Sequence, residues 1–283
     1  MSSLSVSALA KPDALPPHAF RPPELDLSVV IPVYRNAATL EPLYVRLRAA
    51  LEKTGRTWEL LFVEDACPEG SGEVLRRLAA QDPRVAVLAL PRNVGQARAI
   101  WIGLHEVRGH WTVIMDADLQ DPPEAIPVLM EAMARGNGRI AVVFAGRRGR
   151  YEPWGRWLSG WLFRRLRGWL CGIPGDAGGF GVLDRRAVQA VLSWDVPVPQ
   201  WPVLVGCAGL PTVSVPVSRA LRPAGSSAYT SGMRWRLAWQ TLWMVLELRR
   251  RPERWSRLHG AWYLPPDIQR WGARFEATGG PGA

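Results

Sequence analysis

The chain has few of the residues that mark disulfide-rich, metal-cage or membrane-spanning proteins. Its 283 residues include three cysteines, Cys67, Cys171 and Cys207, which are widely spaced and form no Cys-x-x-Cys pattern. An odd number of separated thiols is typical of a reduced intracellular compartment. The four histidines follow no ligand spacing. No window of about 18 uninterrupted apolar residues exists, which argues against a membrane-spanning helix.

Lysine is nearly absent, although the chain is strongly basic. Only Lys11 and Lys53 are lysines among 35 Lys and Arg residues, which oppose 25 Asp and Glu and give a formal net charge of +10. Positive charge on this scale suits polyanions, that is nucleic acid, anionic lipid headgroups or phosphorylated substrates. No nucleic-acid recognition motif accompanies the arginines, so we expect no nucleic-acid partner.

The composition changes along the chain and divides it into four parts. The first part, residues 1–25, is interpreted as a flexible leader, because it lacks the basic n-region and apolar core of a secretory signal. Twelve of the 15 tryptophans lie after residue 150. We expect a main α/β domain over residues 26–230, an Arg/Trp-rich amphipathic helical region over 231–264 and a flexible tail over 265–283.

Strand and helix patterns alternate strictly in the first half of the chain. Candidate strands cover residues 27–33, 58–63, 85–90 and 111–114, and helical periodicity covers 39–52, 71–78 and 97–104. This alternation is typical of a mostly parallel sheet with helices on both faces. No Gly-x-Gly-x-x-Gly and no Walker loop is present, so neither a dinucleotide-binding fold nor a P-loop fold is supported.

Two carboxylates one residue apart, Asp116 and Asp118, stand where the fourth strand should end. In open α/β sheets, ligands collect at the carboxyl ends of the strands. Two such charges are costly to bury unpaired, and hard oxygen ligands in that position suit Mg²⁺ or Mn²⁺ bridging to substrate phosphates. The alternative is a polar loop in which Asp121 caps a helix that begins after it.

Four motifs, in order along the chain, resemble those of the family-two, GT-A-fold inverting glycosyltransferases. They are Val30-Ile31-Pro32-Val33-Tyr34, Val63-Glu64-Asp65, Arg92-Asn93-Val94-Gly95, and Asp-Ala-Asp-Leu-Gln-Asp-Pro-Pro-Glu over residues 116–124. Within that family the chain is most similar to the polyprenyl-phosphate (dolichyl- or undecaprenyl-phosphate) sugar transferases. The likeness covers roughly residues 27 to 240.

This resemblance implies the transfer of a sugar from a UDP- or GDP-sugar donor to an acceptor, expected to be polyprenyl phosphate. It implies that Asp118 and Gln120 hold Mg²⁺ or Mn²⁺ on the donor diphosphate, where the metal neutralises the leaving group. The catalytic residues implied are Asp116, Asp118, Arg147 and Asp176. The donor-binding residues implied are Pro32, Tyr34, Asn36, Asp65, Asn93, Gly95, Asp116 and Arg150.

Two glycines of the acceptor-side loop depart from the family pattern and leave the acceptor open. Gly179 stands where members carry an Asp, and Gly181 where they often carry an Arg. An ionised phosphate acceptor needs no general base, because its second pKa is about 6, whereas a hydroxyl acceptor needs one. Asp176 or Asp195 is a candidate for that base. The alternatives are a transferase that acts on a sugar hydroxyl in polysaccharide or glycolipid assembly, and a degenerate, non-catalytic nucleotide- or lipid-binding partner protein.

Two stretches of the second half combine helical apolar spacing with arginine and tryptophan. They cover residues 154–170 and 233–248, and the second is followed by Arg249-Arg250-Arg251. Basic amphipathic helices with tryptophan fit the headgroup plane of a membrane, but packing on the sheet explains the same periodicity. We expect a cytoplasmic protein that is soluble, peripheral on the inner face of the cell membrane, or bound to a membrane-protein partner.

Overall fold

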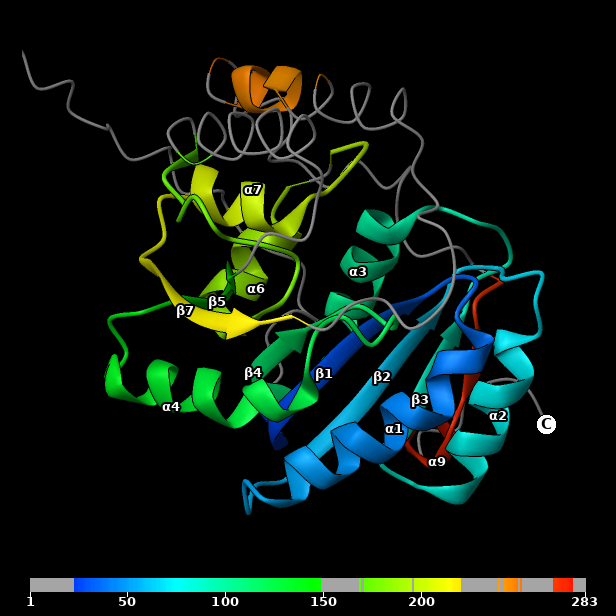
Figure 1. Ribbon diagram of the computed structural model, residues 1–283. Coiled ribbons are helices and arrows are strands. Elements are labelled where there is room, and N and C mark those ends of the chain that lie inside the picture. The colour runs from blue at the N-terminus through cyan, green and yellow to red at the C-terminus, as the bar shows by residue number, and fades with distance from the viewer. Residues whose placement is uncertain are drawn as a thin grey trace, which may run out of the picture.

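The computed structural model describes residues 23–148, 168, 171–194, 196–219, 239, 242–248, 250 and 267–276. Within them, eight strands form one sheet in the order β7-β5-β6-β4-β1-β2-β3-β8 (Figure 1). The strands are β1 Leu25–Val33, β2 Trp58–Glu64, β3 Val85–Ala89, β4 Gly109–Ile114, β5 Val142–Arg148, β6 Gly181–Asp184, β7 Thr212–Ser218 and β8 Gln269–Trp271.

The sheet is mostly parallel, as the β-α alternation predicts. β4, β1, β2 and β3 are parallel neighbours, with Val30 paired to Leu61 and to Ile114. β6 runs antiparallel between β4 and β5, β5 pairs parallel with β7, and β8 pairs antiparallel with β3. The parallel strands β1 to β4 therefore all end at one edge of the sheet, called here the carboxyl edge.

Helices cover both faces of this sheet (Figure 1). α1 Ala37–Glu52, α2 Ser71–Gln81 and α4 Ile126–Arg135 lie on one face, the last after a short 3-10 turn, η2 Pro123–Ala125. α3 Gln96–His105, α6 Arg185–Leu192 and α7 Trp201–Cys207 lie on the other. Alternate strand residues point to opposite faces. Val29 and Ile31 therefore pack against the first set of helices, and Val30 against the second.

The segment after residue 266 completes the sheet and corrects one prediction. Trp271 of β8 pairs with Val87 of β3, and α9 Ala273–Glu276 follows directly. The prediction of a flexible tail over 265–283 is therefore wrong for residues 267–276. β8 supplies backbone partners to an apolar edge strand, which would otherwise expose its hydrogen-bonding groups.

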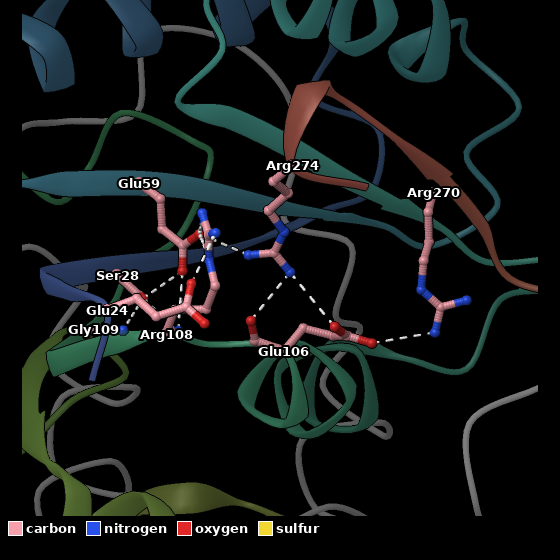
Figure 2. Close-up of polar contacts among 8 residues, drawn as sticks. All are labelled: Glu24, Ser28, Glu59, Glu106, Arg108, Gly109, Arg270 and Arg274. Atoms are coloured by element: carbon pink, nitrogen blue, oxygen red, sulfur yellow. Dashed lines mark hydrogen bonds and ion pairs between the residues drawn. The ribbon is translucent and has the colours of Figure 1, made fainter. Parts of the chain in front are cut away.

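A buried polar cluster fastens α9 to the start of the sheet (Figure 2). Arg274 donates to Glu59 at 2.6 Å, and the two side chains are 7% and 1% exposed. Arg108 and Ser28 donate to the same carboxylate at 2.9 Å and 2.6 Å. We call these four residues the Glu59 cluster. It lies near the beginnings of β1, β2 and β4, at the end of the sheet opposite the carboxyl edge.

Part of the second Arg/Trp stretch is described, and it forms a helix over residues 242–248. Met244, Val245 and Leu248 are buried in the core that α3, α6 and α7 share. The first stretch, residues 154–170, lies outside the described residues apart from Gly168. In the part of the chain that the structure covers, no helix combines the length and the apolar character needed to cross a bilayer.

Candidate functional site

Four loops leave the carboxyl edge and are tied to one another by hydrogen bonds. The loop after β1 meets the loop after β2, where the Arg35 N–H donates to the Cys67 sulfur at 3.1 Å. The loops after β3 and β4 meet through Gln96, whose side chain donates to Asp116 at 2.5 Å. Thr39 at the start of α1 donates to the carbonyl of Ala117 at 2.7 Å. Loops that begin far apart in the sequence therefore form one connected surface.

Asp65 joins the ends of β2 and β3. Its two carboxylate oxygens accept the N–H groups of Val94 at 2.7 Å and Gly95 at 2.9 Å, and the Asn93 side chain donates to its carbonyl. Gly95 has a φ of +83°, a conformation that favours glycine. Burial raises the pKa of Asp65, although these two amides favour the charged form. Asp65 therefore shapes the loop that precedes α3.

The neighbouring Glu64 is held in the same way. Burial is the main cause that raises the pKa of this carboxyl, and the charge of Asp65 adds to it. The Cys67 N–H donates to Glu64 and favours its ionised form. The two acids of the second motif thus bond to backbone amides of their own edge of the sheet.

The Asp-x-Asp loop, residues 115–121, follows β4 and carries the central motif. Asp118 is almost fully buried and accepts the Gln120 N–H at 3.0 Å. Leu119 has a φ of +63°, which is uncommon for a residue with a side chain. Asp121 does not precede a helix directly, since η2 begins at Pro123; it accepts a hydrogen bond from Arg219 at 2.6 Å. The helix-cap alternative for Asp121 is therefore replaced by a long-range ion pair.

The chemistry of this loop fits a hard divalent cation. Asp116, Asp118 and Gln120 offer two carboxylates and an amide oxygen within five residues. Among the described residues, no group of three or more His, Cys, Asp or Glu side chains is arranged to hold a metal. The two carboxylates and the amide leave positions of an octahedral ion open to ligands other than these three. Mg²⁺ is commonly bound in this way, by one or two carboxylates together with substrate phosphates and water.

Asp176 lies further along the sheet, on the loop before β6. It is partly exposed and accepts a hydrogen bond from Ser214 of β7 at 2.8 Å. A side chain at Gly146 of β5 would collide with both groups, so glycine is required beneath them. This arrangement places an acid beside β5 and β7, which are two and three strands from β4 in the sheet.

The two glycines that depart from the family pattern have different surroundings. A Cβ added at Gly179 would meet no atom within 4 Å. One added at Gly181 would lie 2.8 Å from the Val143 carbonyl and 3.2 Å from the Trp201 ring. Position 179 has room for a side chain, whereas Trp201 occupies the space beside position 181.

Most of the predicted site residues lie on loops of the carboxyl edge. Pro32 is in β1, Tyr34 and Asn36 follow it, and the Asn36 side chain accepts the Tyr34 N–H at 3.3 Å. Arg147 lies near the end of β5, and only its backbone is described. Arg150 and Asp195 lie outside the described residues. Their predicted roles stay predictions.

Three residues that fix the Asp-x-Asp loop were missed by sequence reasoning. Gln96 is the first residue of α3 and directly follows the Arg92–Gly95 motif. Its place next to that motif is the signal that could have found it. Thr39 is the third residue of α1. The sequence pattern does not distinguish it from other polar residues at the start of a helix. Arg219 lies 98 residues after its partner Asp121. Nothing in the local pattern indicates that pairing.

The region that builds this edge matches a known family. The model of glycosyl transferase family 2 matches residues 28–192, from β1 to the end of α6. The chain belongs to glycosyltransferase family 2. An uncharacterized glycosyltransferase of Bacillus subtilis, YkcC, is 32% identical over 207 residues, which are 72% of this chain and 64% of that protein. An undecaprenyl-phosphate 4-deoxy-4-formamido-L-arabinose transferase of Edwardsiella ictaluri is 33% identical over 210 residues, which are 72% of this chain and 62% of that protein.

This chain therefore spans less than two thirds of the length of these curated relatives. Among solved structures, it is similar to glucosyl-3-phosphoglycerate synthase from Mycobacterium tuberculosis in complex with Mn²⁺, UDP-glucose and glycerol 3-phosphate. The TM-score is 0.57 at 20% identity, over 80% of each chain. At this identity the likeness concerns the fold, which is of the GT-A type, as the sequence resemblance implies.

Proposed function

We propose that this family 2 protein transfers a sugar from a nucleotide-sugar to polyprenyl phosphate, with inversion at the anomeric carbon. The observation that carries the proposal is the Asp-x-Asp loop. It offers Asp116, Asp118 and Gln120 at the carboxyl edge and is fastened there by Thr39, Gln96 and Arg219. Relatives named as undecaprenyl-phosphate sugar transferases support the choice of acceptor.

In this proposal, each part of the carboxyl edge has a task in moving the sugar from a nucleoside diphosphate to a polyprenyl phosphate. Asp118 and Gln120 would hold Mg²⁺ or Mn²⁺ on the donor diphosphate, and the ion would offset the charge of the leaving nucleoside diphosphate. Asp116, oriented by Gln96, would lie beside the donor sugar. Asp65 and Gly95 would define one wall of the nucleotide pocket through the bonds between them.

The proposal predicts metal-dependent binding of one nucleotide-sugar. Calorimetric titration of UDP- and GDP-sugars with Mn²⁺, repeated with EDTA, measures it. Asp118→Ala should abolish the metal-dependent part of binding and transfer. Glu131→Ala, an exposed acid in α4, is the matched control and should leave both unchanged. Absence of binding to every donor would favour the degenerate partner protein instead.

A second acceptor class is favoured by one observation. Asp176 is partly exposed on the acceptor side and has a defined partner in Ser214. An acid in this place suits a general base for a sugar hydroxyl, whereas an ionised phosphate needs none. Asp176→Asn separates the two: loss of about 10²- to 10⁴-fold in kcat indicates a hydroxyl acceptor. Retention of most activity with a polyprenyl phosphate supports the first proposal.

We also propose that the protein works at the inner face of the cell membrane. The helix over residues 242–248 and the helical residue Trp239 place Trp239, Trp243 and Leu246 outward, 70%, 50% and 38% exposed. Trp243 and Leu246 share one side of this helix, opposite the buried Val245 and Leu248. Exposed Arg250 is one helical turn further along. Exposed indoles beside arginine suit an anionic lipid surface; a membrane-protein partner is the other occupant that a binding test would distinguish.

A further inference from the structure

A buried ion pair connects the Asp-x-Asp loop to the sheet edge formed by β7. Arg219, the residue after β7, donates its Nε to Asp121 Oδ1 at 2.6 Å. The two side chains are 15% and 2% exposed. Taking two charges out of water is costly, and apolar pairs of similar volume are often at least as stable. A pair in this place is therefore better explained by the geometry it fixes than by stability.

The geometry that the pair fixes is that of the loop carrying the predicted metal ligands. Thr39 holds the loop at Ala117, and Gln96 holds it at Asp116. Leu119 has a left-handed backbone, a conformation that persists only where the surroundings fix it. Beyond Leu119, Arg219 pairs with Asp121 inside the loop, and Arg46 of α1 pairs with Glu124 three residues later. Because Asp121 directly follows Gln120, a displacement of Asp121 moves the amide and changes its relation to Asp118.

We propose that Arg219 is a positioning residue for metal and donor binding, acting through Asp121. The inference rests on the proposed function, because it assumes that Asp118 and Gln120 hold the cation. Arg219 itself lies outside residues 28–192, the range that the family model matches.

The test compares two buried arginine–carboxylate pairs of the same length. Arg219→Met removes one partner of the pair at the Asp-x-Asp loop. Arg274→Met removes one partner of the Glu59 cluster, which has a 2.6 Å pair with side chains 7% and 1% exposed (Figure 2). Free Mn²⁺ is followed by electron paramagnetic resonance while the ion is titrated into each full-length protein at saturating UDP or GDP. Thermal unfolding of the same samples reports the loss of stability.

We expect both variants to lose stability and only Arg219→Met to bind Mn²⁺ more weakly, by about 10- to 100-fold. The double variant Asp121→Asn with Arg219→Met removes both charges. It should regain stability, because no unpaired charge is left buried, while its Mn²⁺ affinity stays low. Recovery of stability and affinity together would show a purely structural role and overturn the proposal.

Three other results overturn the inference, and they differ in what else they reject. Mn²⁺ binding by Arg219→Met within twofold to threefold of the wild type rejects the positioning role alone. So does an equal loss of affinity in Arg274→Met. If the wild type binds no Mn²⁺ with either nucleotide, the proposed function fails and the inference fails with it.

Discussion

At the scale of single residues, the segment from Gly179 to the first residue of β6 contains one position with space and one without. Gly179 faces open space, while Gly181 lies against the Val143 carbonyl and the Trp201 ring. Both were predicted to affect the acceptor because family members carry Asp and often Arg there. The structure shows that the two positions differ in the space available for a side chain. A side chain at 181 requires the Val143 backbone to shift and also meets the Trp201 ring, whereas a Cβ at 179 meets no neighbouring atom within 4 Å.

Substitution of these glycines should therefore have unequal effects on stability. We expect Gly179→Asp to change the free energy of unfolding by no more than about 0.5 kcal/mol, as for an uncrowded surface site. Gly181→Arg should cost about 1–3 kcal/mol or more, because its Cβ collides with the Val143 carbonyl and the side chain then meets Trp201. Urea unfolding of both variants measures the difference. Equal destabilisation would mean that the space at position 179 is filled in solution.

Asp65 has partners within the protein in addition to the donor-binding role that the resemblance implies for it. The family resemblance assigns it to the donor pocket. In the structure its carboxylate binds the amides of Val94 and Gly95, on a loop that follows a different strand. A donor-binding role stays a prediction. The observed bonds give Asp65 the task of joining two loops.

At the scale of elements, the helix over residues 242–248 has two apolar sides. One side, with Met244 and Val245, is packed in the core, and the other presents Trp243 and Leu246 outward. The sequence pattern alone left membrane contact and core packing as alternatives. Core packing is observed on one side of this helix, and membrane contact is the proposal for the outward side.

Replacement of the outward tryptophans should weaken vesicle binding without affecting the fold. We expect Trp239→Ser with Trp243→Ser to lower the partition coefficient on vesicles containing phosphatidylglycerol by about tenfold or more, since apolar area buried in the interface is lost. Val45→Ser with Val128→Ser is the matched control, because these valines are 63% and 51% exposed on the α1 and α4 side. Co-sedimentation measures both. An equal effect of the two pairs would reject a specific lipid-facing side.

The elements themselves were largely predictable, because their signals are local. The pattern over residues 27–33 predicted β1 to within two residues at its start. Asp184 caps α6, where its side chain accepts the Ala187 N–H at 2.9 Å. The partners of Asp121 and of the edge strand β3 come instead from residues 219 and 269–271. Such distant pairings depend on the finished fold and leave no periodic trace in the sequence.

At the scale of the whole molecule, the Glu59 cluster links α9 to the first, second and fourth strands (Figure 2). Burial alone would raise the pKa of Glu59. The charges of Arg274 and Arg108 and the hydrogen bond from Ser28 outweigh it, so the pKa lies below the ordinary value. A carboxylate with a lowered pKa in the folded state contributes stability above its unfolded pKa. That contribution is lost as the pH falls through the folded pKa.

Acid titration should reveal this cluster as a source of pH-dependent stability. We expect the free energy of unfolding of the wild type to fall as the pH decreases below about 5. In Glu59→Gln the fall should be shallower by up to one proton, about 1.4 kcal/mol per pH unit. Denaturant unfolding between pH 3 and pH 6 measures both slopes. Identical slopes would show that Glu59 keeps its ordinary acidity in the folded protein.

The position of β8 also sets an order of events during synthesis. β3 ends at Ala89 and its outer partner begins at Gln269, so 180 residues must be translated before the two can pair. At about 5–20 residues per second this takes roughly 10 to 40 s. During that time the apolar edge of β3 is open to other unpaired strands in the cell. A chain stalled before Gln269 is therefore expected to aggregate through β3, and chaperone demand should be greatest in that interval.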